Sequence, residues 1–197
     1  MRNEMLARIR GALGRREGDP VAPAPAVRFE PMLGGDLASR FRSALTALGG
    51  SVIEAAGVTE AKACLETLLE GKTFVSSGAG LLRSLGIGRR FSREECTRAE
   101  FGVTSAEYAL ADTGTLVLGS ERGESRLVSL LPPRHIAVVE RAKILTSLDE
   151  WLSIVPHPAD RASATVLVTG PSRTADIEMR LVRGVHGPGE ISVIVVG

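Results

Sequence analysis

The chain has 197 residues, of which 44% are hydrophobic, and its 24 Lys and Arg residues against 23 Asp and Glu leave a net charge of +1. This charge balance, with only five Phe, one Trp and one Tyr, gives no support to nucleic-acid binding. No segment reaches the roughly 18 apolar residues of a membrane span, and residues 1–17 lack the apolar centre of a signal peptide. We therefore expect a soluble, cytoplasmic protein without a membrane span.

The N-terminal part of the chain differs from the rest in composition. Residues 1–17 predict a basic amphipathic helix, and residues 18–35 contain four prolines, which favour an extended arm. We interpret 1–35 as an N-terminal helix with a Pro-rich arm and 36–197 as the folded domain. Packing on its own domain or docking on another protein is favoured for this helix over binding to a membrane.

From Asp36 onward the pattern alternates between helices and strands. Helices are expected to follow the capping residues Asp36 and Ser147 and to begin at Thr59 and Pro171, and Thr104 with Glu107 fits a capping box before residues 105–111. The expected strands are 51–55, 72–77, 113–120, 135–140, 164–170 and 191–196. Several of these strands are apolar on both faces, which is typical of a parallel sheet covered by helices on both sides. The pattern predicts an α/β fold.

The segment VTGPSRTADIE, residues 168–178, is the richest candidate for a ligand site. A strand is expected to lead through Gly170, Ser172, Arg173 and Thr174 into a helix over 171–184. The N–H groups of a helix N-terminus, two hydroxyls and a guanidinium all suit a carboxylate or a phosphate. Because open α/β sheets bind ligands at the carboxyl ends of their strands, we expect a small-anion site there. The alternative is that Ser172 or Thr174 only caps the helix.

The turn ADTGT, residues 111–115, places Asp112, Thr113, Gly114 and Thr115 immediately before a strand. Its carboxylate and hydroxyls suit ligand binding, and Asp112 is a candidate catalytic acid or base. Asp-Thr-Gly is also ordinary turn chemistry, so a purely structural turn stays open. An aspartic-protease site is excluded, since the sequence has no second copy of this motif and no all-β pattern.

The three histidines are interpreted differently. His186 lies between glycines in GVHGPGE, where its imidazole can move a proton near neutral pH, although a structural loop histidine is an equal alternative. His135, at the start of a strand, is interpreted as structural, and His157 as a surface residue. Their spacing does not match a zinc site, and the two cysteines, Cys64 and Cys96, cannot hold an iron–sulfur cluster unaided. We expect no metal and no cofactor bound by this chain.

Three runs resemble the LUD domain family and, within it, the lactate-utilisation C proteins: GVTSAEYALADTGTLVLGS, SLLPPRHIAVVERAKIL and VTGPSRTADIEMRLVRGVHGPGEISVIVV. The resemblance is dense over residues 102–197, and its most specific parts are GPSRTADIE and GVHGP. It implies a three-layer α/β/α sandwich with a mainly parallel sheet, similar to the group of ribose-phosphate isomerase, glucosamine-phosphate deaminase and CoA transferases.

The resemblance also implies a function. It suggests a non-cluster subunit of a bacterial system that oxidises L-lactate to pyruvate, whose partners, the lactate-utilisation proteins A and B, would carry the iron–sulfur clusters. No catalytic residue is carried over from the family. One alternative is an independent enzyme on a phosphorylated or CoA-linked metabolite, for which Glu107 and Glu178 are the available nucleophiles. Another is a scaffold that docks iron–sulfur partners through residues 1–35.

Overall fold

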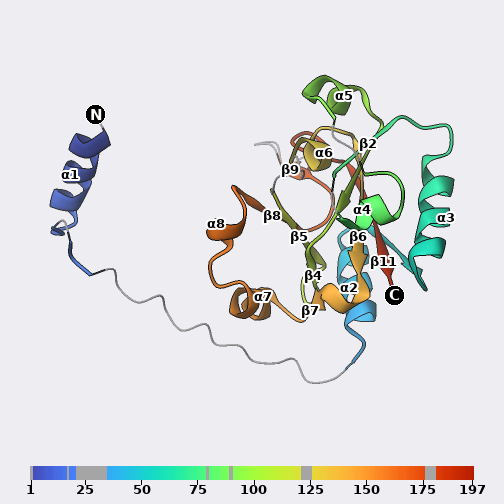
Figure 1. Cartoon of the computed structure of the whole chain (residues 1–197), viewed down its shortest axis with the longest axis horizontal. Helices are drawn as coiled ribbons and strands as arrows, with labels where there is room; N and C mark the ends of the chain where they lie inside the picture. The colour runs from blue at the N-terminus through green and yellow to red at the C-terminus, as the bar shows by residue number, and fades with distance from the viewer. Residues whose placement is uncertain are drawn as a thin grey trace.

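The computed structural model describes residues 2–16, 18–20, 35–78, 80–88, 91–120, 126–175 and 181–197. Its centre is a five-stranded sheet in the order β2-β3-β6-β11-β1, in which every pair of neighbours is parallel. The strands are β1 (Ser51–Ala55), β2 (Phe74–Ser76), β3 (Phe101–Ser105), β6 (Arg134–Glu140) and β11 (Glu190–Val196). Figure 1 shows this sheet running through the middle of the domain. The predicted α/β class with a mainly parallel sheet is confirmed.

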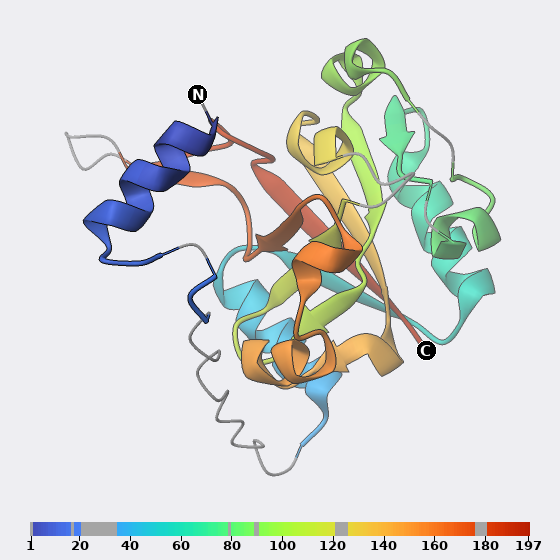
Figure 2. The ribbon, with the colours of Figure 1, turned by 60° about the vertical axis from the view of Figure 1, so that its left-hand side comes forward.

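The central strands are apolar on both faces because both faces are covered. In β11, Val193 and Val195 belong to one buried cluster, whereas Ile194 and Val196 belong to the cluster on the opposite face. The helices α3 (Val58–Leu69) and α4 (Gly80–Ser84) cover the second of these faces. Helix α2 (Leu37–Ala47) covers the first, and Figures 1 and 2 show α2 and α3 on opposite sides of the sheet.

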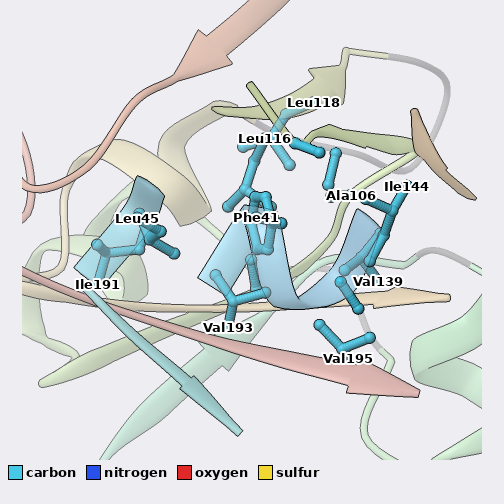
Figure 3. Close-up of a cluster of buried hydrophobic side chains, with 14 residues drawn as sticks. Phe41, Leu45, Ala106, Leu116, Leu118, Val139, Ile144, Ile191, Val193 and Val195 are labelled. Atoms are coloured by element: carbon cyan, nitrogen blue, oxygen red, sulfur yellow. The ribbon is translucent and has the colours of Figure 1, made fainter. Parts of the chain in front are cut away.

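A second, mixed sheet completes the layer that contains α2. Its order is β7-β4-β5-β8, with β4 (Tyr108–Leu110), β5 (Thr115–Gly119), β7 (Ile144–Leu145) and β8 (Thr165–Val168). Figure 3 shows Phe41 of α2 between Leu116 of β5 and Val193 of the parallel sheet, and all three side chains are fully buried. One outer layer is therefore part helix and part sheet.

The N-terminus of α2 is fixed by hydrogen bonds and charge. The side chain of Asp36 accepts a hydrogen bond from the N–H of Ala38, as expected of an N-cap. The Arg141 guanidinium donates to both carboxylate oxygens of Asp36, at 3.0 and 2.9 Å, and lowers the pKa of that carboxyl. A third hydrogen bond from Arg141 reaches Glu54 at the carboxyl end of β1, so α2 is tied to the parallel sheet.

The remaining elements surround these layers. They are α1 (Arg2–Ala12), α5 (Arg93–Arg98), α6 (Arg126–Leu130), the 3-10 helix Arg141–Lys143, α7 (Leu148–Ile154), α8 (Pro158–Arg161), β9 (Arg173–Ala175) and β10 (Leu181–Arg183). The predicted N-terminal helix is confirmed as α1, which buries none of its residues. No helix in the described part of the chain is long and apolar enough to cross a membrane.

Two sequence-based predictions of helices are wrong. The helix predicted over 171–184 is replaced in the described residues by β9 and β10, which pair antiparallel with Arg173 opposite Arg183. The carbonyl of Ser172 accepts the N–H of Gly184 across this pair, at 3.0 Å, so it is not available for a helical bond. Thr104 lies inside β3, and the N–H of Glu107 donates to Val117 of β5, which excludes a capping box there.

Candidate functional site

A crevice of about 200 Å³ lies between the amino end of the parallel sheet, α6 and β8. Its floor is formed by His135 of β6 and Ile191 of β11, which are register partners on neighbouring strands. The other lining residues are Ser129, Leu130, Val166, Leu167, Val168, Thr169, Gly170, Ser172, His186, Gly187 and Pro188. Both the TGPS segment and the VHGP loop therefore contribute to one crevice, so Gly170, Ser172 and His186 lie together.

Backbone hydrogen bonds hold these two segments in place. The N–H of Ser172 donates to Pro188 O at 2.8 Å, and the N–H of Gly184 returns a bond to Ser172 O. The N–H of Gly189 donates to Pro133 O at 2.9 Å, which fixes the loop against the residue that precedes β6. This main-chain pairing places the exposed His186 and the half-buried Ser172 along the same crevice.

The position of the crevice corrects the sequence-based expectation. The VHGP loop precedes β11, and His135 is the second residue of β6, so the crevice lies at the amino ends of the parallel strands. The TGPS segment does follow the carboxyl end of β8, but β8 belongs to the second sheet and runs antiparallel to β5. It also leads into β9 rather than into a helix, so the expected helix N-terminus supplies no N–H groups to an anion.

His135 is a crevice residue that sequence reasoning interpreted as structural. Its side chain is 2% exposed, and its Nε2 atom lies 2.8 Å from Oγ1 of Thr104 on the neighbouring strand β3. Burial lowers the pKa of His135 to about 4, so its imidazole is neutral at neutral pH. The sequence offered one signal: a polar ring near the start of the otherwise apolar run HIAVV needs a partner when it is buried.

A glycine in β3, the strand next to His135, explains why α6 lies so close to the parallel sheet. Gly102 of β3 is the register partner of His135, and a Cβ added at Gly102 would lie 1.8 Å from the carbonyl oxygen of Val128 in α6. A side chain at this position is excluded by that contact. The glycine lets α6 pack directly against β3, which brings Ser129 and Leu130 to the edge of the crevice.

A chain of hydroxyl groups joins the ADTGT turn to the crevice. Thr113 Oγ1 donates to Asp112 Oδ1 at 3.0 Å, Thr113 and Thr115 are 2.8 Å apart, and Thr115 and Thr169 are again 2.8 Å apart. Because the carboxylate takes the proton of Thr113, the next bonds must run from Thr115 to Thr113 and from Thr169 to Thr115. The oxygen of Thr169, which lines the crevice, is left as an acceptor.

Gly114 has a structural role in the same turn. Its φ is +66°, and a Cβ on it would lie 2.5 Å from the backbone nitrogen of Leu45 in α2. The turn therefore packs against the helix backbone, while Asp112 and Thr113 remain exposed. Asp112 does not line the crevice and reaches it through the hydroxyl chain.

Arg173 lies outside the lining of the crevice. It faces Arg183 across the β9–β10 pair, and both guanidinium groups lie beside Gly49, within 3.3 to 3.6 Å of the position that a Cβ would take there. Gly49 follows α2, whose C-terminal end carries the negative end of the helix dipole. No described acidic residue forms an ion pair with either arginine. Thr174, between Arg173 and the described end of β9, is half-buried and pairs with Val182.

The two cysteines do not form a joint site. Cys64 packs against the cluster under α3, whereas Cys96 is buried in a separate cluster with Val75, Ala99 and Val128. Desolvation by burial, with Glu95 nearby, raises the pKa of the Cys96 thiol. Within the described residues, no group of three or more His, Cys, Asp and Glu side chains is placed to hold a metal ion.

Comparison with known proteins assigns the crevice to a recognised domain. The LUD domain model matches residues 83–196. Lactate utilization protein C of Macrococcus caseolyticus is 41% identical over 103 residues, covering 50% of this chain and 45% of that protein. The protein of that name from Bacillus licheniformis is 43% identical over 107 residues, covering 52% and 45%. The match thus spans about half the length of these curated relatives.

One solved structure shows the same fold. A crystal structure of a DUF162 family protein from Deinococcus radiodurans aligns with a TM-score of 0.63 at 23% sequence identity. The alignment covers 82% of this chain and 96% of that chain, so the two share their architecture over most of the described domain.

Proposed function

The chain belongs to the LUD domain family, and on that basis we propose that it is a component of a bacterial lactate-utilisation system. The observation that carries this proposal is that the crevice-forming segments fall inside the matched range, 83–196, and that relatives about 40% identical there are named lactate utilization protein C. In the finer form of the proposal, the chain is a non-cluster subunit in the oxidation of L-lactate to pyruvate.

The electron-transferring clusters would then belong to partner proteins, the iron–sulfur lactate-utilisation proteins A and B. The whole sequence has two cysteines, and their side chains lie in separate groups of buried apolar residues. An iron–sulfur cluster would therefore need ligands from another protein. A docking role for residues 1–35 is supported by α1, which exposes Met5 and Ile9, and by the exposed Leu13 that follows it. Deleting residues 1–35 should reduce co-purification of these partners if the arm docks them.

The crevice is proposed to bind a small carboxylate such as L-lactate or pyruvate. Its volume, about 200 Å³, is below the usual range for drug-sized ligands and suits a three-carbon acid. Ser172 offers a hydroxyl donor to the carboxylate, Thr169 offers an acceptor to a ligand hydroxyl, and Leu130 and Ile191 offer apolar surface to a short alkyl chain. Arg173 and Arg183, on the adjacent hairpin, would attract the anion electrostatically.

Two groups are proposed to move a proton at this site. His186 lines the crevice directly, and its exposed imidazole can exchange protons with solvent. Asp112 can act through Thr113 and Thr115, because the hydroxyl chain from the carboxylate ends at Thr169. Gly114 and Gly170 would serve by allowing close packing, against Leu45 and Leu48, rather than by touching the ligand.

A second candidate function is that of an enzyme acting on a phosphorylated or CoA-linked metabolite. One observation favours it: Glu107 lines a separate cavity of about 240 Å³, with Lys143 and Arg161, at the carboxyl ends of β3 and β6. Incubation with a panel of acyl-CoA compounds, followed by mass spectrometry, tests for a covalent adduct at Glu107. Absence of turnover and of any adduct would remove this candidate.

Growth on L-lactate tests the leading proposal. The gene would be deleted in a host that uses L-lactate and restored as the wild type or as Gly187→Leu, which adds a side chain to the lining of the crevice. Gly187 tolerates a side chain, because its Cβ would meet Ser172 at an ordinary 3.5 Å. We expect the wild type to restore growth on L-lactate and the variant to restore it poorly. Normal growth of the deletion strain, with no second copy of the gene, would refute the role.

A further inference from the structure

The floor of the crevice carries a buried imidazole that the proposed function leaves unused. His135 is 2% exposed, and Thr104 holds its Nε2 atom at 2.8 Å. Among the described residues, none forms a hydrogen bond with Nδ1 of this ring. Because His135 also lines the crevice, a ligand there can form a hydrogen bond with this nitrogen, and such a bond adds affinity.

We infer that Nδ1 of His135 binds an uncharged oxygen next to the carboxylate of the ligand, so that the crevice selects 2-hydroxy or 2-oxo acids over plain carboxylates. This inference rests on the proposed function, because it names the substrate class of the same crevice. His135 is a specificity-determining residue in this account, whereas the arginines of the hairpin act on the carboxylate charge.

The position of the proton on the His135 ring decides whether Nδ1 donates a hydrogen bond to the ligand oxygen or accepts one from it. Because burial lowers the pKa of His135 to about 4, the ring carries a single N–H at neutral pH. If Thr104 donates to Nε2, then Nδ1 carries the hydrogen and can donate to a hydroxyl or to a keto oxygen. If Nε2 donates to Thr104, then Nδ1 only accepts, and a hydroxyl is bound but a keto oxygen is not. A hydroxyl fits both arrangements.

The surroundings of His135 fit a small acid with a short alkyl chain. Ile191 on β11 lies beside it in register, and Leu130 of α6 lines the same crevice. Ser129 already donates its hydroxyl to the carbonyl of Arg126, at 3.1 Å, so it offers an acceptor and not a donor. Among the described residues of the lining, His186 is the other titratable side chain. A methyl group can therefore pack on Ile191 and Leu130 while the 2-oxygen meets His135.

Calorimetric titration of the full chain with L-lactate, pyruvate and propionate tests this inference. Propionate has the same carbon chain and carboxylate but lacks the 2-oxygen. We expect the wild type to bind L-lactate about tenfold more tightly than propionate, which is the size of one neutral hydrogen bond. In His135→Phe the ratio should fall to about one, while the exposed His157→Phe control keeps it. A folded His135→Phe protein that keeps the wild-type ratio would overturn the inference.

A second measurement on the wild type covers the case in which His135→Phe does not fold. With three histidines in the chain, ¹⁵N-labelled imidazole signals can be assigned individually by NMR. The signals of His135 should shift with L-lactate and much less with propionate, and unchanged signals would refute the inference. Equal affinity of the wild type for all three acids would refute the selectivity for the 2-oxygen but not the small-carboxylate site. Failure to bind any of them would also refute the small-carboxylate site.

Discussion

The hydroxyl of Thr115 lies 2.8 Å from that of Thr169, which joins the ADTGT turn to the TGPS segment across two strands and 54 positions of sequence. Thr115 is 4% exposed and begins β5, while Thr169 directly follows β8, the neighbouring antiparallel strand. Two motifs that look independent in the sequence therefore form one hydrogen-bonded unit at the edge of the crevice.

Removing the middle hydroxyl of this unit should destabilise the domain. Thr115→Val keeps the branched shape but removes two hydrogen bonds at a buried position, with an expected loss of about 1–3 kcal/mol in the free energy of unfolding. Urea denaturation measures this loss. Thr67→Val is the matched control, because Thr67 is exposed and bonds only within α3, to Ala63. Equal effects of the two substitutions would contradict the assigned role of Thr115.

Gly114 should not tolerate a side chain. Gly71 has the same φ of +66° but no heavy atom within 4 Å of a built Cβ, whereas at Gly114 the Cβ would lie 2.5 Å from Leu45 N. Gly71→Ala should therefore cost about 1–2 kcal/mol for the left-handed conformation alone. Gly114→Ala should cost at least about 2 kcal/mol more, because α2 must move. Thermal unfolding of both variants gives the difference, and similar costs would show that the turn does not press on α2.

The buried His135 should make stability depend on pH in a defined window. In the unfolded chain its pKa is about 6.5, and burial lowers it to about 4 in the folded protein. As pH falls from 6.5 to 4, the unfolded state binds a proton that the folded state does not, so the free energy of unfolding decreases by about 3 kcal/mol.

Denaturation at several pH values tests this dependence. The slope between pH 6.5 and 4 should flatten in His135→Phe and persist in His157→Phe. Glu100 does not produce this slope near pH 6, because a backbone hydrogen bond from Thr73 lowers the pKa of its carboxyl and moves its titration to lower pH. A slope that is unchanged in His135→Phe would show that His135 is not its source.

The arginine pair of the hairpin should control how salt affects ligand binding. Arg173→Gln and Arg183→Gln should each weaken the binding of a small carboxylate by about threefold to tenfold at low salt, and less at high salt. Arg98→Gln is the control, because this arginine pairs with Glu94 within α5. Equal losses in all three variants, or no loss in the hairpin variants, would argue against electrostatic attraction by this pair.

Much of the fold could be predicted from the sequence because its signals are local. Asp36 and Ser147 cap helices as expected, and the nearly continuous apolar run 191–196 gives a strand buried on both faces. The prediction of a helix after Gly170 is wrong because hydrogen bonds to residues distant in sequence determine the conformation of that segment. The backbone hydrogen bonds of Ser172 with Gly184 and Pro188 cannot be predicted from the periodicity of apolar residues.

The site was predictable only in part, for a related reason. Gly170, Ser172 and His186 stand out by composition, and the structure places them in one crevice. His135 did not stand out, because its role comes from Thr104 on another strand and from the close packing that Gly102 allows. Arg173 was expected beside the ligand, yet strand alternation in β9 directs it to Gly49. Which side of a strand a residue occupies depends on register, and register here is set by distant segments.

The most direct test of the account is a calorimetric titration of L-lactate into the purified chain and into Gly187→Leu. We expect saturable one-to-one binding to the wild type, and binding at least about tenfold weaker in the variant with an unchanged unfolding temperature. A wild-type chain that binds neither L-lactate nor pyruvate, or a variant that binds as tightly as the wild type, would contradict a carboxylate site in this crevice.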